Sequence, residues 1–120
     1  MFRSAIVLTG LLLFIISAAS TSFAADTKQV YDFYCAQCHG LTGKGDGANV
    51  TNDMATTPRD FSNKADMNKL TDKDVRSAIA DGGPAVGKSA LMPPWSKTLT
   101  DKEIDGLVKH IRMLCKCKGK

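Results

Sequence analysis

Residues 35–40 read CAQCHG, two cysteines separated by two residues, with a histidine directly after the second cysteine. Cysteines at this spacing are typical of a thioredoxin-like redox couple, of half a zinc site, or of the covalent attachment site of a c-type haem. Only the third interpretation requires the histidine. Because the three kinds of site belong to different folds, the pattern of the remaining sequence decides among them.

The N-terminus has the features of a secretory signal peptide. Arg3 precedes an apolar stretch over residues 5–16, and the small-residue pattern Ser22-Phe23-Ala24 follows. The apolar stretch is shorter than the roughly 20 residues that a membrane-spanning helix needs, so we expect cleavage after Ala24. The sequence therefore predicts a signal peptide at 1–24 and one domain at 25–120, exported to the periplasm without stable membrane insertion.

The charge balance argues against binding to nucleic acid. The formal net charge is +4, and the basic residues are scattered along the chain without a stripe of interleaved aromatic residues. Such an excess is too small and too dispersed to indicate a phosphate-binding surface. A domain of this size also buries little apolar surface by itself, which favours an additional staple such as a covalently held cofactor.

Three segments are predicted to be helical, and no stretch alternates convincingly as a strand would. The first spans residues 26–37 and carries the first cysteines at its end. Its apolar side is expected to contain Val30, Phe33 and Tyr34, with Tyr31 at the edge of that side.

The other two helices begin with the same signal, LTDKD and LTDKE. Thr71 and Thr100 are placed as N-caps, and Glu103 completes a capping box in the last helix. Gly82 is expected to end the middle helix. Apolar residues recur at helical spacing in both segments: Val75, Ala78 and Ile79, then Ile104, Leu107, Val108, Ile111 and Leu114. The sequence therefore predicts an all-α domain of three main helices joined by loops.

The segment GLTGKGDGANV, residues 40–50, separates the cysteines from the later helices. Its glycines allow tight turns and a close backbone approach to a bulky group, so we expect a loop. A phosphate-binding loop is rejected because Lys44 is followed by Gly45 instead of Ser or Thr, and because no strand precedes the segment.

The all-helical pattern favours haem attachment over the two alternatives. A thioredoxin-like couple needs a framework of strands and helices that this chain does not indicate. Zinc needs four ligands, and no familiar zinc spacing links CAQCHG to the remaining candidates, which are His110, Cys115 and Cys117. A haem would use all three side chains, with Cys35 and Cys38 forming thioethers to its two vinyl groups and His39 supplying an axial nitrogen.

The second axial ligand has five candidates, which are Met54, Met67, Met92, Met113 and His110. Met92 stands in SALMPPW, where Pro93 and Pro94 stiffen the loop and restrict the methionine to an extended backbone. A stiff loop can present a sulfur to iron. Met113 and His110 lie in the last helix, where packing is the expected role, and His110 is the main rival ligand.

These motifs together resemble the class I c-type cytochromes, especially the small bacterial monohaem type. The pattern CxxCHGxxGxGDG at 35–47 is followed by Pro-Arg-Asp-Phe at 58–61, MPPW at 92–95 and a capped helix from Thr100, and the resemblance covers nearly all of the expected mature chain. It implies a class I cytochrome c fold, with crossed N- and C-terminal helices and a helical shell around one covalent haem c. It also implies His39 and Met92 as axial ligands.

The expected function is that of a periplasmic one-electron carrier, a monomer that exchanges electrons with redox partner proteins and is not an enzyme. Thioether ligation stabilises ferrous iron and raises the reduction potential relative to two histidines. Arg59 and Trp95 are candidate donors to the haem propionates. The alternative is a haem protein whose Met92 is displaced, so that it reduces peroxide or senses a gas.

The tail LCKCKGK holds a second pair of cysteines, Cys115 and Cys117. The spacing CxC without a following histidine excludes a second haem. The pair can be a disulfide, a metal or thiol site, or an intermolecular link, and the oxidising compartment favours the disulfide.

Overall fold

The computed structural model describes residues 21–120, and these residues form helices and loops without strands. Helix α1 (Thr21–Val30) continues into a π-helical segment, η1 (Tyr31–Cys35), and then into α2 (Ala36–His39). Further along lie α4 (Asp72–Asp81) and α5 (Asp101–Cys115), with a short α3 (Lys64–Met67) and a 3-10 turn, η2 (Gly83–Val86), that were not predicted. The predicted all-α class and three main helices are confirmed.

The predicted signal peptide falls mainly on residues 1–20, which lie outside the described residues. Residues 21–24 form the beginning of α1. None of the helices within residues 21–120 is both long and apolar enough to cross a bilayer.

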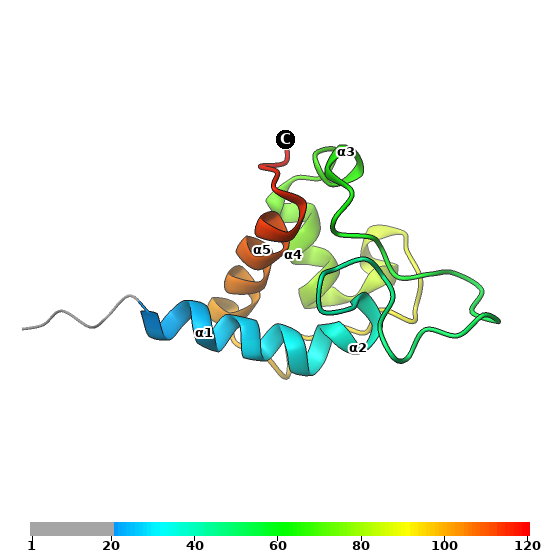
Figure 1. Ribbon diagram of the computed structural model, residues 1–120, viewed down its shortest axis with the longest axis horizontal. Helices are drawn as coiled ribbons and strands as arrows, with labels where there is room; N and C mark the ends of the chain where they lie inside the picture. Colours follow the sequence, from blue (N-terminus) through cyan, green and yellow to red (C-terminus); the bar gives the residue numbers. More distant parts are fainter. Residues whose placement is uncertain (1–20) are drawn as a thin grey trace, which may run out of the picture.

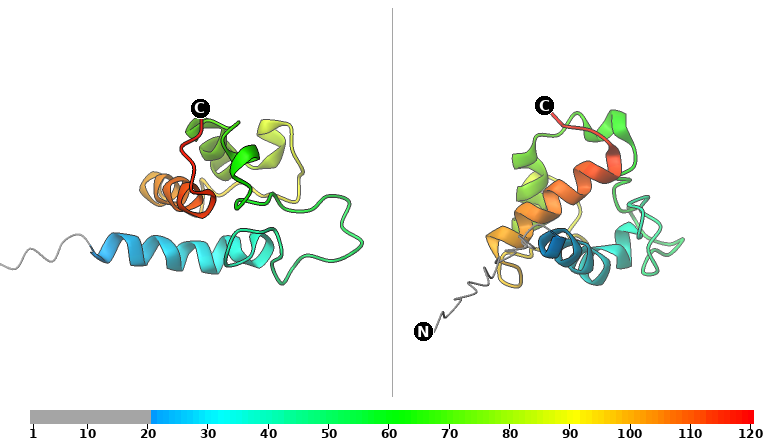
Figure 2. Two further views of the ribbon diagram at one scale, coloured as in Figure 1. Left: turned by 45° about the horizontal axis from the view of Figure 1, so that its top comes forward. Right: turned by 60° about the vertical axis from the view of Figure 1, so that its left-hand side comes forward.

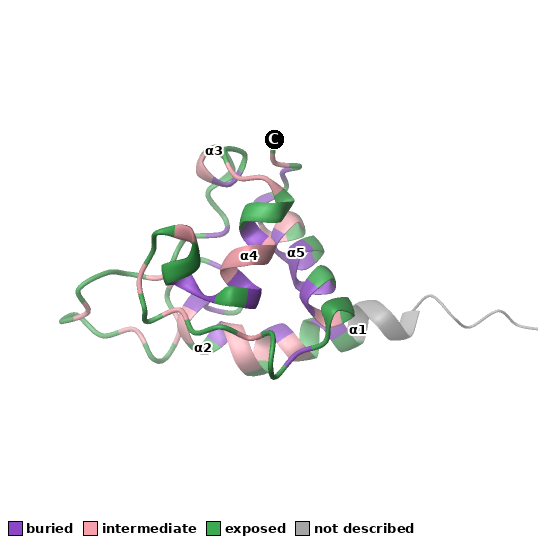
Figure 3. Ribbon diagram, turned by 180° about the vertical axis from the view of Figure 1, so that it is seen from behind, coloured by how far each residue is buried: buried purple, intermediate pink, exposed green. Residues whose placement is uncertain are grey.

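Helices α1 and α5 cross, and α4 also packs against α5 (Figure 1). Figure 2 shows the same crossing from two further directions. Buried residues gather on the inner sides of α4 and α5 (Figure 3). The most deeply buried large side chains are Tyr31, Met67, Ile104 and Leu107. Burial of one such aliphatic side chain contributes about 1.5–3 kcal/mol, so α5 is a principal source of stability.

The predicted apolar side of the first helix is wrong in one residue. Phe33 is 71% exposed, whereas Tyr31, expected only at the edge, is completely buried. The π-helical segment explains the difference, since the backbone N–H of Ala36 bonds to the carbonyl of Tyr31, five residues earlier. This wider turn changes the angular spacing of the side chains, so that Tyr31 and Ala36 face the core.

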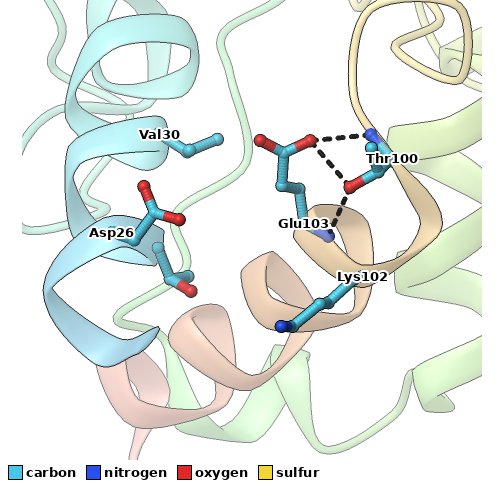
Figure 4. A pocket seen from close by; sticks show the side chains of 6 residues that line it. Asp26, Val30, Thr100, Lys102 and Glu103 are labelled. Carbon is cyan, nitrogen blue, oxygen red and sulfur yellow. Dashed lines mark hydrogen bonds between the residues drawn. The ribbon is translucent and has the colours of Figure 1, made fainter. Parts of the chain in front are cut away.

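Both predicted N-caps are confirmed. The Thr100 side chain accepts a hydrogen bond from the backbone N–H of Glu103, and the Glu103 carboxylate accepts from the backbone N–H of Thr100 at 2.7 Å (Figure 4). Thr71 and Asp74 form a second capping box that was not predicted. These caps satisfy backbone donors that a helix start leaves unpaired, which fixes where α4 and α5 begin.

Replacing Thr100 by alanine is expected to lower the free energy of unfolding by about 1 kcal/mol, because the cap of α5 is lost. Denaturant unfolding of the variant and the parent protein measures the difference. Thr98→Ala is the matched control, since Thr98 is an exposed threonine on the preceding loop. Equal losses for the two variants would contradict a capping role.

Candidate functional site

The three side chains of the CxxCH motif lie where the long N-terminal helical stretch ends. Cys35 is the last residue of η1, while Cys38 and His39 belong to α2. Both cysteines are free and partly exposed, and His39 is buried. Two free thiols and an imidazole are thus gathered on consecutive turns of one helix.

The ring of His39 is held by a hydrogen bond at its edge and by an aromatic ring against its face. Its Nδ1 atom lies 3.2 Å from the carbonyl oxygen of Arg59, and its plane stacks on the ring of Phe61, with centroids 4.2 Å apart. Because a carbonyl can only accept, Nδ1 carries the proton and Nε2 keeps a bare lone pair. Burial lowers the pKa of His39, and the bond to the Arg59 carbonyl opposes this by a smaller amount. The imidazole is therefore neutral, the form that binds metal.

The glycine-rich loop closes the C-terminal end of α2. The backbone N–H of Gly45 donates to the carbonyl of His39 at 2.8 Å, that of Gly47 to Cys38 at 3.1 Å, and that of Asn49 to Gln37 at 2.7 Å. These carbonyls are the ones that a helix end leaves without partners. A Cβ on Gly47 would lie 2.3 Å from the carbonyl oxygen of Gln37, so the close approach requires glycine. The loop amides therefore hold the CxxCH backbone, in agreement with the rejection of a phosphate site.

The loop that contains Met92 is docked against both α4 and the CxxCH helix. The backbone N–H of Trp95 donates to the carbonyl of Ile79 at 3.0 Å. The Trp95 ring meets the ring of Tyr34 edge-on, with centroids 5.2 Å apart. Tyr34 is adjacent to Cys35 in the chain, so this contact brings the segment after Met92 to the helix that carries the cysteines. Met92 itself is half-buried against the core.

The other predicted ligand candidates have different surroundings. Met67 is completely buried in the core, and Met113 is 63% exposed. Met54 is half-buried in the long loop before α3. His110 is buried in α5, where its ring lies 4.5 Å from that of Tyr31. Its position agrees with the predicted packing role.

The thioredoxin-like and zinc interpretations find no support in this geometry. Burial, followed by the neighbouring Cys38, raises the pKa of the Cys35 thiol to about 12. A disulfide oxidoreductase needs the opposite shift, toward the thiolate. Within residues 21–120, no group of three or more His, Cys, Asp or Glu side chains is placed to hold a metal ion.

Two positioning residues were missed from the sequence. Phe61 was noted only as part of Pro-Arg-Asp-Phe, yet it stacks on His39. The hydroxyl of Tyr31 donates to the carbonyl of Gly40 at 2.8 Å, which holds the residue after His39. For Arg59 the structure adds a role for the backbone carbonyl, while its side chain is exposed.

His110 makes stability depend on pH. Burial lowers its pKa; Asp32 opposes this shift and Lys28 adds to it, and Nε2 has no hydrogen-bond partner among the described residues. In the unfolded chain, His110 takes up a proton near the ordinary histidine pKa of about 6.5, whereas in the folded chain it is protonated only at lower pH. The free energy of unfolding is therefore expected to fall as the pH falls through this value.

The measurement is urea unfolding of the wild type and His110→Gln between about pH 5.5 and 7.5, a range centred on the ordinary histidine pKa. The variant should show a flatter pH dependence. His39 is common to both proteins, so their difference isolates His110. Parallel curves would contradict this assignment.

A family model described as cytochrome c oxidase, cbb3-type, subunit III matches residues 23–111. The cbb3-type cytochrome c oxidase subunit CcoP of Azospirillum sp. is 31% identical over 97 residues, which cover 81% of this chain but only 30% of that subunit. Cytochrome c6 of Bryopsis maxima is 34% identical over 82 residues, covering 68% of this chain and 81% of that protein.

The fold is similar to that of a solved structure, the KustC0563 c-type cytochrome, with a TM-score of 0.57 and 24% identity over 73% of this chain and 95% of that one. The donor set agrees with these similarities, since two free thiols at CxxC spacing beside a neutral, oriented imidazole fit a covalently held haem. The chain belongs to the class I c-type cytochromes, electron-transfer proteins whose cofactor is covalently bound haem c.

Proposed function

We propose that this protein is a periplasmic one-electron carrier whose single haem c is attached through Cys35 and Cys38 and ligated by His39 and Met92. The observation that carries the proposal is the state of His39. Its ring is buried, neutral and oriented by Arg59 and Phe61, so that only Nε2 remains to bind iron. The cysteines precede it on the same helical stretch.

Support for Met92 comes from the anchoring of its loop. The carbonyl of Met92 accepts from the N–H of Gly83 at 2.9 Å, and a Cβ on Gly82 would lie 3.1 Å from the same oxygen. Trp95 fixes the other side of the loop against Ile79 and Tyr34. A methionine held at both ends loses little entropy when its sulfur binds iron.

The ligand set determines the chemistry. Bound haem c supplies an iron that changes between ferric and ferrous states, and filled axial positions leave no place for a substrate. With the proton of Nδ1 held at the Arg59 carbonyl and Nε2 on the iron, the His39 ring would have no place for a further proton, so no proton need accompany the electron. A neutral thioether favours the ferrous state and raises the reduction potential.

The proposal also assigns Arg59 and Trp95 to the haem propionates. The carbonyl of Arg59 lies within hydrogen-bond distance of His39, so the exposed Arg59 side chain starts from the backbone at the edge of the same site. Trp95 is half-buried beside Tyr34, and its indole N–H is a donor that needs a partner when covered. Guanidinium and indole groups are donors only, which suits carboxylate recognition.

Visible spectra of the purified protein test the ligation. A low-spin ferric spectrum with the weak long-wavelength band of methionine sulfur on iron is the expected result. A low-spin spectrum without that band would mean that another strong ligand binds the iron in place of Met92, and His110 would be the first candidate. A high-spin spectrum would overturn the proposed electron-carrier function and would favour a protein that binds peroxide or a gas at an open iron position.

Export is tested on the same preparation. The N-terminus of the mature chain, read by mass spectrometry from the periplasmic fraction, is expected at Ala25. A protein that retains residues 1–24 in that fraction would contradict the signal peptide.

A further inference from the structure

A disulfide joins Cys115, at the end of α5, to Cys117. The chain between them is a single residue, Lys116. A disulfide stabilises a fold mainly by restricting the unfolded chain, and a loop this short restricts it little. Stability alone therefore does not explain this disulfide, and the one-electron transfer proposed above does not use it.

The guanidinium of Arg112 lies beside one sulfur of this disulfide. The Arg112 side chain is only 11% exposed, and its guanidinium donates to the carbonyls of Met67 at 2.9 Å and Leu70 at 2.7 Å and to the carboxylate of Asp72 at 2.8 Å. The same group lies 3.6 Å from Sγ of Cys117. Exposed cations also follow each cysteine, at Lys116, Lys118 and Lys120.

Both sulfurs have suitable partners for their reduced forms. Sγ of Cys115 lies 3.4 Å from the carbonyl oxygen of Arg112, which could accept from a thiol. Sγ of Cys117 faces the Arg112 guanidinium, which stabilises a thiolate. The surroundings therefore offer a carbonyl to a protonated Cys115 and a guanidinium to an ionised Cys117.

The backbone N–H groups of Lys116 and Cys117 donate to Met113 and Arg112 of α5, both at 3.2 Å, and the last two residues are held by long hydrogen bonds. Gly119 donates to the side chain of Asn68 at 3.2 Å and Lys120 to the carbonyl of Leu70 at 3.4 Å. Lys116, between the cysteines, has a positive φ of 50°, a conformation unfavourable for a residue with a side chain. Both cysteines are buried, and Cys117, three residues before Lys120, is the more accessible of the two, with 9% exposed against 2% for Cys115.

We propose that Cys115 and Cys117 form a thiol–disulfide exchange site that accepts two electrons from a protein dithiol. A thiolate of the dithiol attacks Sγ of Cys117, the Cys115–Cys117 bond breaks, and Cys115 takes up a proton and donates to the Arg112 carbonyl. The second thiol of the partner then attacks its own sulfur in the mixed disulfide and releases Cys117 beside the guanidinium. Two electrons and the proton of the partner's second thiol have then passed to the cysteine pair, which leaves Cys115 protonated and Cys117 ionised.

Arg112 is a positioning residue for this exchange. It stabilises the Cys117 thiolate as a leaving group, and a better leaving group departs faster. The reaction does not involve the iron, so it stands or falls independently of the proposed haem ligation.

The experiment uses the full mature haem protein and dithiothreitol as the dithiol probe. Under native conditions, we expect the C-terminal peptide to take up two iodoacetamide labels after reduction and none before it. Reoxidation with oxidised glutathione should remove both labelling sites. The haem spectrum of the same sample reports the iron separately.

The pH dependence of alkylation in the reduced protein separates chemistry from packing. Arg112→Gln is expected to slow the labelling of Cys117 at neutral pH about tenfold, the effect of one pKa unit on the thiolate fraction. Arg112→Lys should recover part of the rate. Arg76→Gln is the matched control. Arg76 lies on α4 and pairs with Asp101 and Asp105 in the first turns of α5, whereas the disulfide lies at the other end of α5.

Two outcomes would overturn the proposal. The first is a disulfide that dithiothreitol reduces only after the protein is unfolded in urea. The second is equal labelling of Cys117 in the wild type, Arg112→Gln and Arg112→Lys, each shown by circular dichroism to be folded.

Discussion

Replacing Met92 by alanine is expected to lower the reduction potential by on the order of 0.1 V or more, since axial ligands set haem potentials over about 0.8 V. The variant loses the thioether that stabilises ferrous iron and leaves one axial position open. Potentiometric titration measures the shift. The ferric spectrum should become high-spin, and the ferrous protein should bind carbon monoxide, which the wild type should exclude.

Met113→Ala is the matched control for this experiment. Met113 is also a methionine of the C-terminal half, but it is 63% exposed on α5. Its loss should leave potential, spin state and carbon monoxide binding unchanged. If Met92→Ala also left all three unchanged, Met92 would not be the ligand. If the Met92 variant stayed low-spin with a lowered potential, another side chain would have taken the position.

The capped helices could be predicted closely from local sequence. Thr71 and Thr100 place the starts of α4 and α5, and Gly82 follows the last residue of α4. Capping depends on hydrogen bonds within four residues, so the information lies within the segment itself. The first helix was predicted less well because the π-helical segment at Tyr31–Cys35 interrupts the usual periodicity. Nothing in the residues YDFYC distinguishes a π-helix from an α-helix.

The candidate site could be predicted as a set of residues but not as a geometry. The spacing of Cys35, Cys38 and His39 indicated haem once the all-helical pattern had excluded the two alternatives. The orientation of His39 depends on Arg59 and Phe61, about twenty residues later in a loop without periodicity. A backbone carbonyl leaves no mark on the sequence, because every residue has one. Such contacts follow from how the loop folds back on the helix end.

The second large effect is expected at Phe61. Its ring is buried and stacks on His39 with an interplanar angle of 13°, and its backbone N–H donates to the carbonyl of Gly43 at 2.6 Å. Phe61→Ala should lower the free energy of unfolding by about 3–5 kcal/mol, the range for a buried phenylalanine. Denaturant unfolding measures it. Phe33→Ala is the control, because Phe33 is 71% exposed and its loss should change stability by about 0.5 kcal/mol or less.

Phe61→Leu separates the two roles of this ring. Leucine keeps most of the apolar volume, so the loss of stability should be smaller, about 1.5 kcal/mol or less. It cannot stack on an imidazole, however, and the His39 ring would be held only by its bond to the Arg59 carbonyl. The ferric electron paramagnetic resonance spectrum, which is sensitive to the orientation of axial ligands, should therefore shift in Phe61→Leu as well as in Phe61→Ala. A leucine variant with reduced stability and an unchanged spectrum would mean that Phe61 packs the core and that the hydrogen bond alone orients His39.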